Sequence, residues 1–253
     1  MGSVRFWLRV TTAVVVALVG LGLGLQEADV WEPSRQFLTL MVAASVTIAF
    51  ITTAEAAVAQ YRHGRAEEIR EQARAVLAPL LLELEEATGI STRYLGVSAY
   101  RLRPKLLPFR RRRLERLIRM QLIIRVASGI AWRESVGVIG QCVERREDII
   151  ENLATLDEQL SDVTPEEWKT LSPDLTYGLS YDEYLRVRGK YEVILATPMI
   201  RETPLGSRVI GCIAIDAPQA AFDALARDET RGIVAAAAVP LAALLTQAGL
   251  RWR

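Results

Sequence analysis

Two apolar runs near the amino terminus constrain this chain more than any other feature. The first, residues 6–25, carries a single charge, Arg9, and the second, residues 37–60, has 18 uncharged residues before Glu55. A helix needs about 20 mostly apolar residues to cross the hydrocarbon core of a bilayer. Both runs are therefore predicted to span a membrane, and together they would form a helical hairpin that contacts membrane lipid.

The charges around these runs indicate their orientation. Arg5 precedes the first run and Arg62 follows the second, whereas the linker, residues 26–35, carries three acidic residues and one arginine. Basic residues favour the cytoplasmic side, so the sequence predicts a two-pass protein of the cell membrane with both termini in the cytoplasm. A cleaved signal peptide is the alternative for the first run, but a second run follows it and no clear cleavage pattern is present.

Three residues inside the runs are candidates for helix assembly. Gly20 and Gly24 form a GxxxG pair, which lets two helices approach closely. Glu55 is an ionisable group in the last turns of the second run and would be costly if it faced lipid. It either reaches the cytoplasmic interface or faces a pore or another helix.

The overall composition excludes several classes of function. The net charge is +1, and His63 is the single histidine of 253 residues. A globally basic nucleic-acid binder and a multi-histidine zinc site are therefore not indicated, and we expect no nucleic acid, metal or cofactor. Two cysteines are too few for a disulfide scaffold. No catalytic triad, P-loop or paired-carboxylate motif stands out, so the sequence predicts that the chain is not an enzyme.

The remainder of the chain is predicted to contain three parts. Residues 62–90 have the spacing of an amphipathic connecting helix with a kink at Pro79, residues 91–227 form a domain of mixed strand and helix patterns, and residues 228–253 form a helix that is apolar on nearly all sides. Within the domain, residues 93–102 alternate like a strand, residues 191–215 read as an antiparallel hairpin, and residues 114–128 fit either a helix or a strand. Helix caps are predicted at Thr164 and Ser180.

Two motifs carry a resemblance to a known family. GVIGQCVERREDI, residues 137–149, resembles the glycine-bearing turn and short helix of GAF domains, and VIGCIAIDAP, residues 209–218, is similar to their final strand. The resemblance covers about residues 65–250. It implies an α+β fold in which a central antiparallel sheet is flanked by helices, with one face toward a small-molecule pocket. The first and last helices of the family usually build a dimer, so we expect a homodimer or higher oligomer.

The leading hypothesis is a membrane-anchored bacterial sensor whose domain binds a small molecule, a nucleotide being one candidate, and relays the change to the membrane helices or a partner. The signature of the cyclic-nucleotide branch of the family is absent. Aromatic side chains and one charge are the candidate ligand contacts: Tyr100, Trp132, Tyr177, Tyr181, Tyr184 and Arg186. The alternative is a defence-type effector that oligomerises and perturbs the membrane. A third option, a sulfoxide reductase, would depend on Cys142 and Cys212.

Four consecutive arginines, Arg110, Arg111, Arg112 and Arg113, lie within LPFRRRR. On the GAF resemblance they fall in a surface loop, where they are solvated or paired within the protein. Contact with anionic lipid is the second hypothesis, since each arginine near such a surface gains about 1 kcal/mol. The last helix could also touch the membrane, although dimer packing is the preferred interpretation.

Overall fold

The computed structural model describes residues 13, 17, 20–22, 24, 34–103, 111–123, 128–204 and 206–250. Its contacts divide the chain into two compact units, Met1–Ala66 and Glu67–Arg253. Most of the first predicted span, residues 6–25, lies outside the described residues.

The second apolar run lies in a long helix, α2 (Arg35–Thr88), which crosses from the first unit into the second. In the first unit its large apolar side chains are exposed, among them Phe37, Leu40, Val46, Phe50 and Ile51. Of the described helices, α2 and the segment Asp228–Gln247 are long and apolar enough to cross a bilayer. The predicted transmembrane hairpin therefore has weak support from α2, and it remains a prediction.

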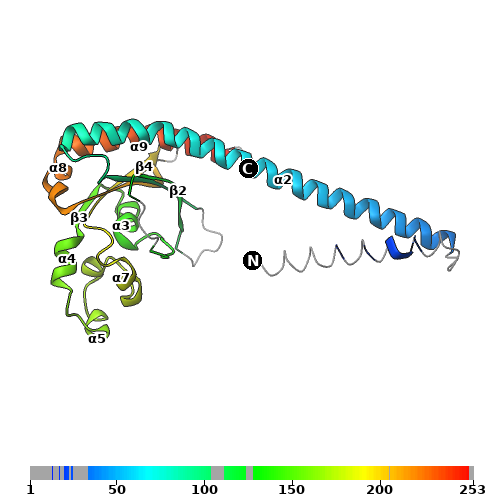
Figure 1. Cartoon of the computed structure of the whole chain (residues 1–253), viewed down its shortest axis with the longest axis horizontal. Helices are drawn as coiled ribbons and strands as arrows, with labels where there is room; N and C mark the ends of the chain where they lie inside the picture. Colours follow the sequence, from blue (N-terminus) through cyan, green and yellow to red (C-terminus); the bar gives the residue numbers. More distant parts are fainter. Residues whose placement is uncertain are drawn as a thin grey trace. The chain divides into compact units, whose positions relative to one another are not determined.

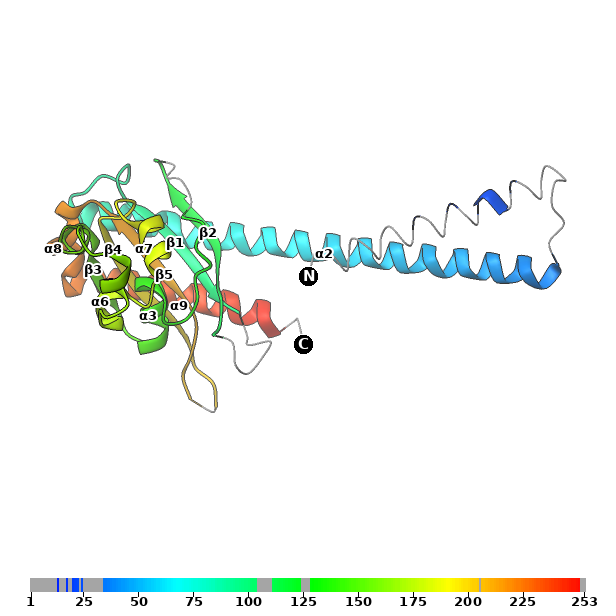
Figure 2. The same ribbon diagram turned by 90° about the horizontal axis from the view of Figure 1, so that it is seen from below.

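A five-stranded antiparallel sheet forms the centre of the second unit, in the order β2-β1-β5-β4-β3. The strands are β1 (Gly96–Leu102), β2 (Leu114–Gln121), β3 (Ile149–Asn152), β4 (Val193–Arg201) and β5 (Arg208–Ala217). The predicted hairpin is confirmed as β4 and β5, whose connection extends away from the rest of the sheet (Figure 2). The ambiguous segment 114–128 contributes the edge strand β2, which pairs with β1.

Two helices cover one face of this sheet (Figure 1): the end of α2, and α9 (Asp228–Leu250). Leu77, Leu80 and Leu84 of α2 are almost completely buried and share one apolar core with Ile213 and Ile215 of β5. Burying a leucine contributes about 1.5–3 kcal/mol, so these three side chains hold α2 firmly on the sheet. Two short helices, η1 (Gln219–Ala221) and α8 (Phe222–Ala226), connect β5 to α9.

The opposite face of the sheet carries α3 (Gly137–Arg145) and a second apolar core. Val138, Ile139 and Cys142 of α3 pack with Tyr100 of β1 and Ala214 of β5. Side chains alternate between the two faces of a strand, so Ala214 lies on this face and its neighbours Ile213 and Ile215 on the other.

Four short helices and their turns, residues 153–190, form a segment that we call the lid. They are α4 (Leu153–Gln159), α5 (Pro165–Trp168), α6 (Pro173–Thr176) and α7 (Tyr181–Val187). The predicted caps are confirmed: Thr164 with Glu167, and Ser180 with Glu183, form complete capping boxes. The lid has a small core of its own around Trp168 and Tyr184. In fold class, the second unit is α+β with an antiparallel sheet flanked by helices, as predicted.

Candidate functional site

Two adjoining cavities lie on the α3 side of the sheet. The first, of about 30 Å³, is lined by β1, β2 and β5, and the second, of about 40 Å³, is lined largely by the lid. Trp132, Val138, Tyr191 and Ile194 line both of them. The two cavities are therefore parts of one site, with the sheet as its floor and the lid as its cover.

An ion pair lies at the sheet end of this site. Nη2 of Arg119 on β2 is 3.3 Å from Oδ1 and 3.2 Å from Oδ2 of Asp216 on β5, and both side chains are only 10% exposed. Nε of Arg119 is buried and has no hydrogen-bond partner among the described residues. Removing two charges from water costs several kcal/mol per ion, which their mutual attraction recovers only with good geometry. A contribution to folding stability alone therefore does not explain why the Arg119–Asp216 ion pair is buried here.

The strand between the two charged residues leaves room for them. β1 lies between β2 and β5, and Gly96 of β1 is directly opposite Asp216. A Cβ atom on Gly96 would lie 2.5 Å from Oδ1 of Asp216. The carboxylate therefore lies over the glycine backbone, which is how it extends across β1 toward Arg119.

Aromatic rings surround the ion pair. The guanidinium carbon of Arg119 lies 5.7 Å from the centre of the Tyr191 ring, which is within the range of a cation–π interaction. The Trp132 ring lies against Gly137 at the start of α3, where a Cβ atom would be 2.5 Å from it. Gly137 also has a positive φ of 68°, which glycine adopts without strain. Trp132 can form the wall of the site because residue 137 has no side chain.

The lid end of the site is aromatic and mostly apolar. The Trp168 and Tyr184 rings stack with their centres 4.5 Å apart, and Tyr181 meets Trp168 edge-on at 5.8 Å. Nε1 of Trp168 donates a hydrogen bond to the carbonyl oxygen of Leu179 at 3.0 Å. Trp168 and Tyr184 line the second cavity, together with Leu156.

The phenols of the site are held in the neutral form. Burial raises the pKa of Tyr100 to about 12, and the nearby Cys212 thiol acts in the same direction. Burial, followed by the nearby Asp157 carboxylate, raises the pKa of Tyr184 to about 12. Burial and a hydrogen bond to Glu151 also raise the pKa of Tyr177 above its usual range. These hydroxyl groups are therefore neutral at physiological pH and are available as hydrogen-bond donors.

Polar contacts attach the lid to the domain. Glu183 of α7 receives hydrogen bonds from Nη1 and Nη2 of Arg133 at 2.9 and 3.3 Å, and Arg145 of α3 pairs with Asp174 at 2.5 Å. The backbone N–H of Gly137 donates to the Tyr177 carbonyl oxygen at 2.8 Å. The lid is thus held to the domain by ion pairs and hydrogen bonds in addition to apolar contact.

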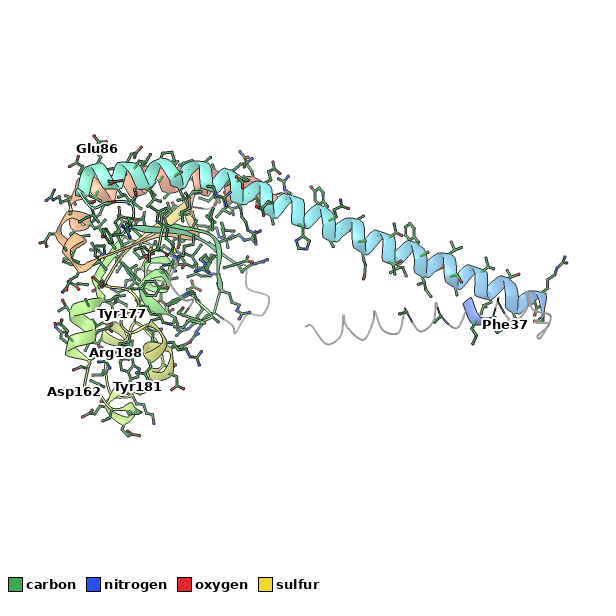
Figure 3. The ribbon with its side chains drawn as sticks, viewed as in Figure 1. Phe37, Glu86, Asp162, Tyr177, Tyr181 and Arg188 are labelled. Atoms are coloured by element: carbon green, nitrogen blue, oxygen red, sulfur yellow. The ribbon has the colours of Figure 1, made fainter. Side chains whose placement is uncertain are left out.

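The six residues predicted as ligand contacts lie in different places. Tyr100 and Trp132 line the first cavity, and Trp132, Tyr177 and Tyr184 line the second. Tyr181 lies within the lid beside Trp168, and Arg186 is exposed on α7; neither lines a cavity. Figure 3 shows Tyr177 and Tyr181 within the lid.

Four residues of the site were not predicted from the sequence: Arg119, Asp216, Trp168 and Tyr191. Asp216 was part of the motif on which the GAF resemblance rests, and its place in that motif, two residues before Pro218, was the available signal. Arg119 lies in segment 114–128, whose apolar residues fitted either a helix or a strand. The side of the element on which Arg119 lies could therefore not be predicted. No local signal pairs it with a residue 97 positions away.

The residues predicted to contact the membrane lie partly outside the described residues. Gly20 and Gly24 are helical and exposed, and Glu55 is exposed on α2. Arg110 is not described, whereas Arg111 and Arg113 are exposed. Arg112 forms an ion pair with Glu134, and its Nε lies 3.2 Å from the Glu134 carboxylate.

Both cysteines are buried in the core beneath α3. Burial raises the pKa of the Cys142 and Cys212 thiols far above their ordinary value, and neither lines a cavity. Among the described residues, no three His, Cys, Asp or Glu side chains are grouped as metal ligands.

This arrangement, a cavity between an antiparallel sheet and a helical lid, gives the second unit a GAF-like fold. No family model and no curated protein matches the chain. Among solved structures, it is similar to the type II free methionine-R-sulfoxide reductase of Thermoplasma acidophilum, at 16% identity over 71% of this chain and 96% of that one, with a TM-score of 0.42. It is also similar to fRMsr of Staphylococcus aureus, at 13% identity, 71% and 94% coverage and a TM-score of 0.37. A GAF domain matches at 12% identity, 67% and 87% coverage and a TM-score of 0.36.

These neighbours correct one prediction. From its sequence the chain was predicted not to be an enzyme, and that prediction is contradicted because free methionine-R-sulfoxide reductases are among the neighbours. Domains with this kind of fold include enzymes as well as sensors, so the absence of a familiar catalytic motif did not justify excluding catalysis.

Proposed function

We propose that the chain is a membrane-anchored sensory protein whose GAF-like domain binds a small molecule in the cavity between the sheet and the lid. The observation that carries the proposal is the site itself: aromatic walls around a buried ion pair, closed by a segment with its own core. Concave sites that combine apolar walls with a few polar groups are the usual form of ligand pockets.

Ligand entry requires the lid to move. The two cavities have volumes of about 30 Å³ and about 40 Å³, which is room for water molecules. Pockets for drug-sized ligands are larger, about 300 Å³ or more. The lid can shift as a unit because Trp168 and Tyr184 pack within it. The ion pairs Arg133–Glu183 and Arg145–Asp174 would open or rearrange in this step.

The sheet provides the path from the site to the helices. On β5, Ala214 and Asp216 face the cavity, while Ile213 and Ile215 pack in the core shared with α2 and α9. A ligand that displaces β5 therefore moves side chains on both faces of the sheet, including those that pack against α2 and α9. We propose that the resulting change in the buried part of α2 is what the domain relays to the membrane helices or a partner.

Exposed apolar surface supports the proposed anchoring in a membrane. We propose that the apolar run of α2 and the run at residues 6–25 span the cell membrane, with the domain in the cytoplasm. Phe50 is 73% exposed and Leu40 is 68% exposed, and lipid would cover such side chains. The test is fractionation of cells that express the full chain. Protein that stays in the membrane fraction after extraction with alkaline carbonate supports anchoring, and protein recovered in the soluble fraction refutes it.

A second copy of the chain is the proposed partner of the helical layer. α9 presents a stripe of small apolar residues to solvent, Ala235, Ala236, Val239 and Ala243, and α2 presents Ala75 and Leu82. The α9 residues recur at three- and four-residue spacing and the two α2 residues are seven apart, as on one face of a packed helix. A homodimer would bury this stripe.

Thermal unfolding of the full chain in lipid nanodiscs tests ligand binding. Nucleotides, amino acids and other metabolites are added singly, because a ligand of the folded state raises the midpoint of unfolding. An Ala214→Leu variant, which fills the floor of the first cavity, should lose the stabilisation. The control Ala43→Leu lies on exposed α2 and should keep it. If no compound stabilises the protein, and native mass spectrometry detects no retained small molecule, the proposed function is wrong.

A further inference from the structure

We propose that Arg119 and Asp216 form a head-group subsite for a small zwitterion, a molecule that carries a carboxylate and an ammonium group together with an apolar side group. This inference rests on the proposed function and assigns a ligand class to the same site. The carboxylate of the ligand would bind Arg119, and its ammonium group would bind Asp216.

The charges of the subsite favour such a ligand. Arg119 and Asp216 line the first cavity side by side, and the pair as a whole is neutral. A simple anion that approaches Arg119 meets the Asp216 carboxylate, and a simple cation that approaches Asp216 meets the guanidinium group. A molecule with both charges satisfies both residues, and each contact is a charge-assisted hydrogen bond.

The existing pair leaves donor capacity for a ligand. A single nitrogen, Nη2 of Arg119, contacts both oxygens of Asp216. Both distances are longer than the length of about 2.7–2.9 Å that is usual for such bonds. Nε of Arg119 is buried without a hydrogen-bond partner among the described residues. A buried unsatisfied donor is costly, so an arriving carboxylate would satisfy it.

The backbone beneath the subsite is shaped for this arrangement. Because a Cβ atom on Gly96 would collide with the Asp216 carboxylate, glycine at this position lets the carboxylate lie flat over β1. Ser98, which is 3% exposed, and Tyr100 add hydroxyl groups to the same lining. Several strands thus contribute to one polar corner.

The neighbouring cavity is suited to the rest of the ligand. It adjoins the ion pair through Trp132 and Tyr191, which line both cavities, and continues between apolar lid residues such as Leu156 and Leu179. A charged head at the sheet and an apolar body at the lid fit a molecule of the amino-acid type. A ligand in this position would contact the lid and the sheet simultaneously.

The test compares four probes that share the branched carbon chain of leucine, by calorimetry on the full chain in nanodiscs: L-leucine, 4-methylpentanoate, 3-methylbutylamine and 4-methylpentanamide. L-leucine should bind, and each probe that lacks one or both charges should bind at least about tenfold more weakly, the order of effect expected for a lost charge-assisted partner. Equal binding of a singly charged or neutral probe would overturn the inference. So would no binding of L-leucine.

A double variant separates binding from folding. A single substitution would remove one charge of this buried pair and keep the other, whereas Arg119→Met with Asp216→Asn removes both charges and is expected to fold. It should lose L-leucine binding while its circular dichroism stays that of the wild type. The control pair Arg112→Met with Glu134→Gln, a partly buried ion pair outside the cavity lining, should keep binding. Undiminished binding by the first double variant would refute the head-group role.

The metabolite panel of the preceding section distinguishes the two proposals. If a compound that is not a zwitterion stabilises the wild type but not Ala214→Leu, and L-leucine does not bind, the cavity is a ligand site and the zwitterion assignment alone is wrong. If neither the panel nor L-leucine binds, both proposals are wrong.

Discussion

Gly96 of β1 lies directly beneath the carboxylate of Asp216 on β5, and a Cβ atom at residue 96 would come within 2.5 Å of Oδ1. The neighbouring strand thereby determines where the acidic side chain lies. The contact with Arg119 on the far side of β1 depends on this one missing side chain.

Gly96→Ala should therefore displace Asp216 and lower the free energy of unfolding by about 1–3 kcal/mol, the usual cost of forcing extra atoms into a packed site. Urea denaturation of the full chain measures the change. Gly232→Ala is the matched control, because nothing lies within 4 Å of a Cβ atom at that exposed helical position. It should stabilise the protein by about 0.5–1 kcal/mol. Equal effects of the two substitutions would contradict the proposed contact.

Trp168→Ala should loosen the lid and leave the sheet intact. The indole is 6% exposed and stacks on Tyr184, and truncation of a buried aromatic side chain costs about 3–5 kcal/mol. Hydrogen exchange should accelerate across residues 153–190 and stay slow in β5, because the lid has its own core. Leu175→Ala, at a 44% exposed position of the lid, serves as control and should change exchange little. Uniform acceleration through the whole domain would show that the lid does not move as a unit.

Acid should release the lid through Glu183. Burial raises the pKa of this carboxyl group, but the hydrogen bonds from Arg133 and the Ser180 backbone outweigh burial and hold the pKa below its ordinary value of 4.5. A lowered folded-state pKa stabilises the protein above the unfolded-state pKa, and the contribution is lost as pH falls through the folded value. Lid exchange should thus rise below about pH 4.5 in the wild type. In Glu183→Gln, part of this pH dependence should vanish, whereas Asp182→Asn, exposed on the same turn, should retain it.

Val239→Glu should dissociate the proposed homodimer without unfolding the domain. Val239 is 69% exposed on α9, so a charge there is solvated in the monomer but would be buried in the interface. Light scattering in detergent, with the detergent mass subtracted, measures the change from dimer to monomer. Gln247→Glu adds the same charge at another exposed position of α9 and is the control. A wild type that is already monomeric would rule out this interface.

The thiols of Cys142 and Cys212 should be unreactive in the native protein. Burial raises the pKa of both thiols, so little nucleophilic thiolate forms at neutral pH. Iodoacetamide at pH 8 should leave them unmodified until urea is added, as measured by mass spectrometry of the intact chain. Rapid native alkylation of either thiol would revive a thiol-dependent reductase as a function. Unchanged reductase activity in a Cys142→Ser, Cys212→Ser double variant would exclude that chemistry.

Local signals determined the parts of this protein that depend on neighbours in the sequence. Thr164 and Ser180 each precede a glutamate by three residues, and both form the predicted capping boxes because a cap satisfies backbone groups within one turn. The connector rich in turn residues between β4 and β5 likewise predicted their hairpin. The apolar composition of residues 37–60 predicted a helix, which α2 contains.

The tertiary structure alone decided the site. The apolar residues of segment 114–128 fitted the period of a helix and that of a strand equally well. Pairing with β1 selected the strand, because a paired strand satisfies the backbone hydrogen-bonding groups along that edge of β1. The order β2-β1-β5 then brought Arg119 within hydrogen-bonding distance of Asp216 across Gly96. All three residues are visible in the sequence, but sequence pattern and propensity relate residues only a few positions apart. Strand order relates Arg119 to Asp216, which are 97 positions apart.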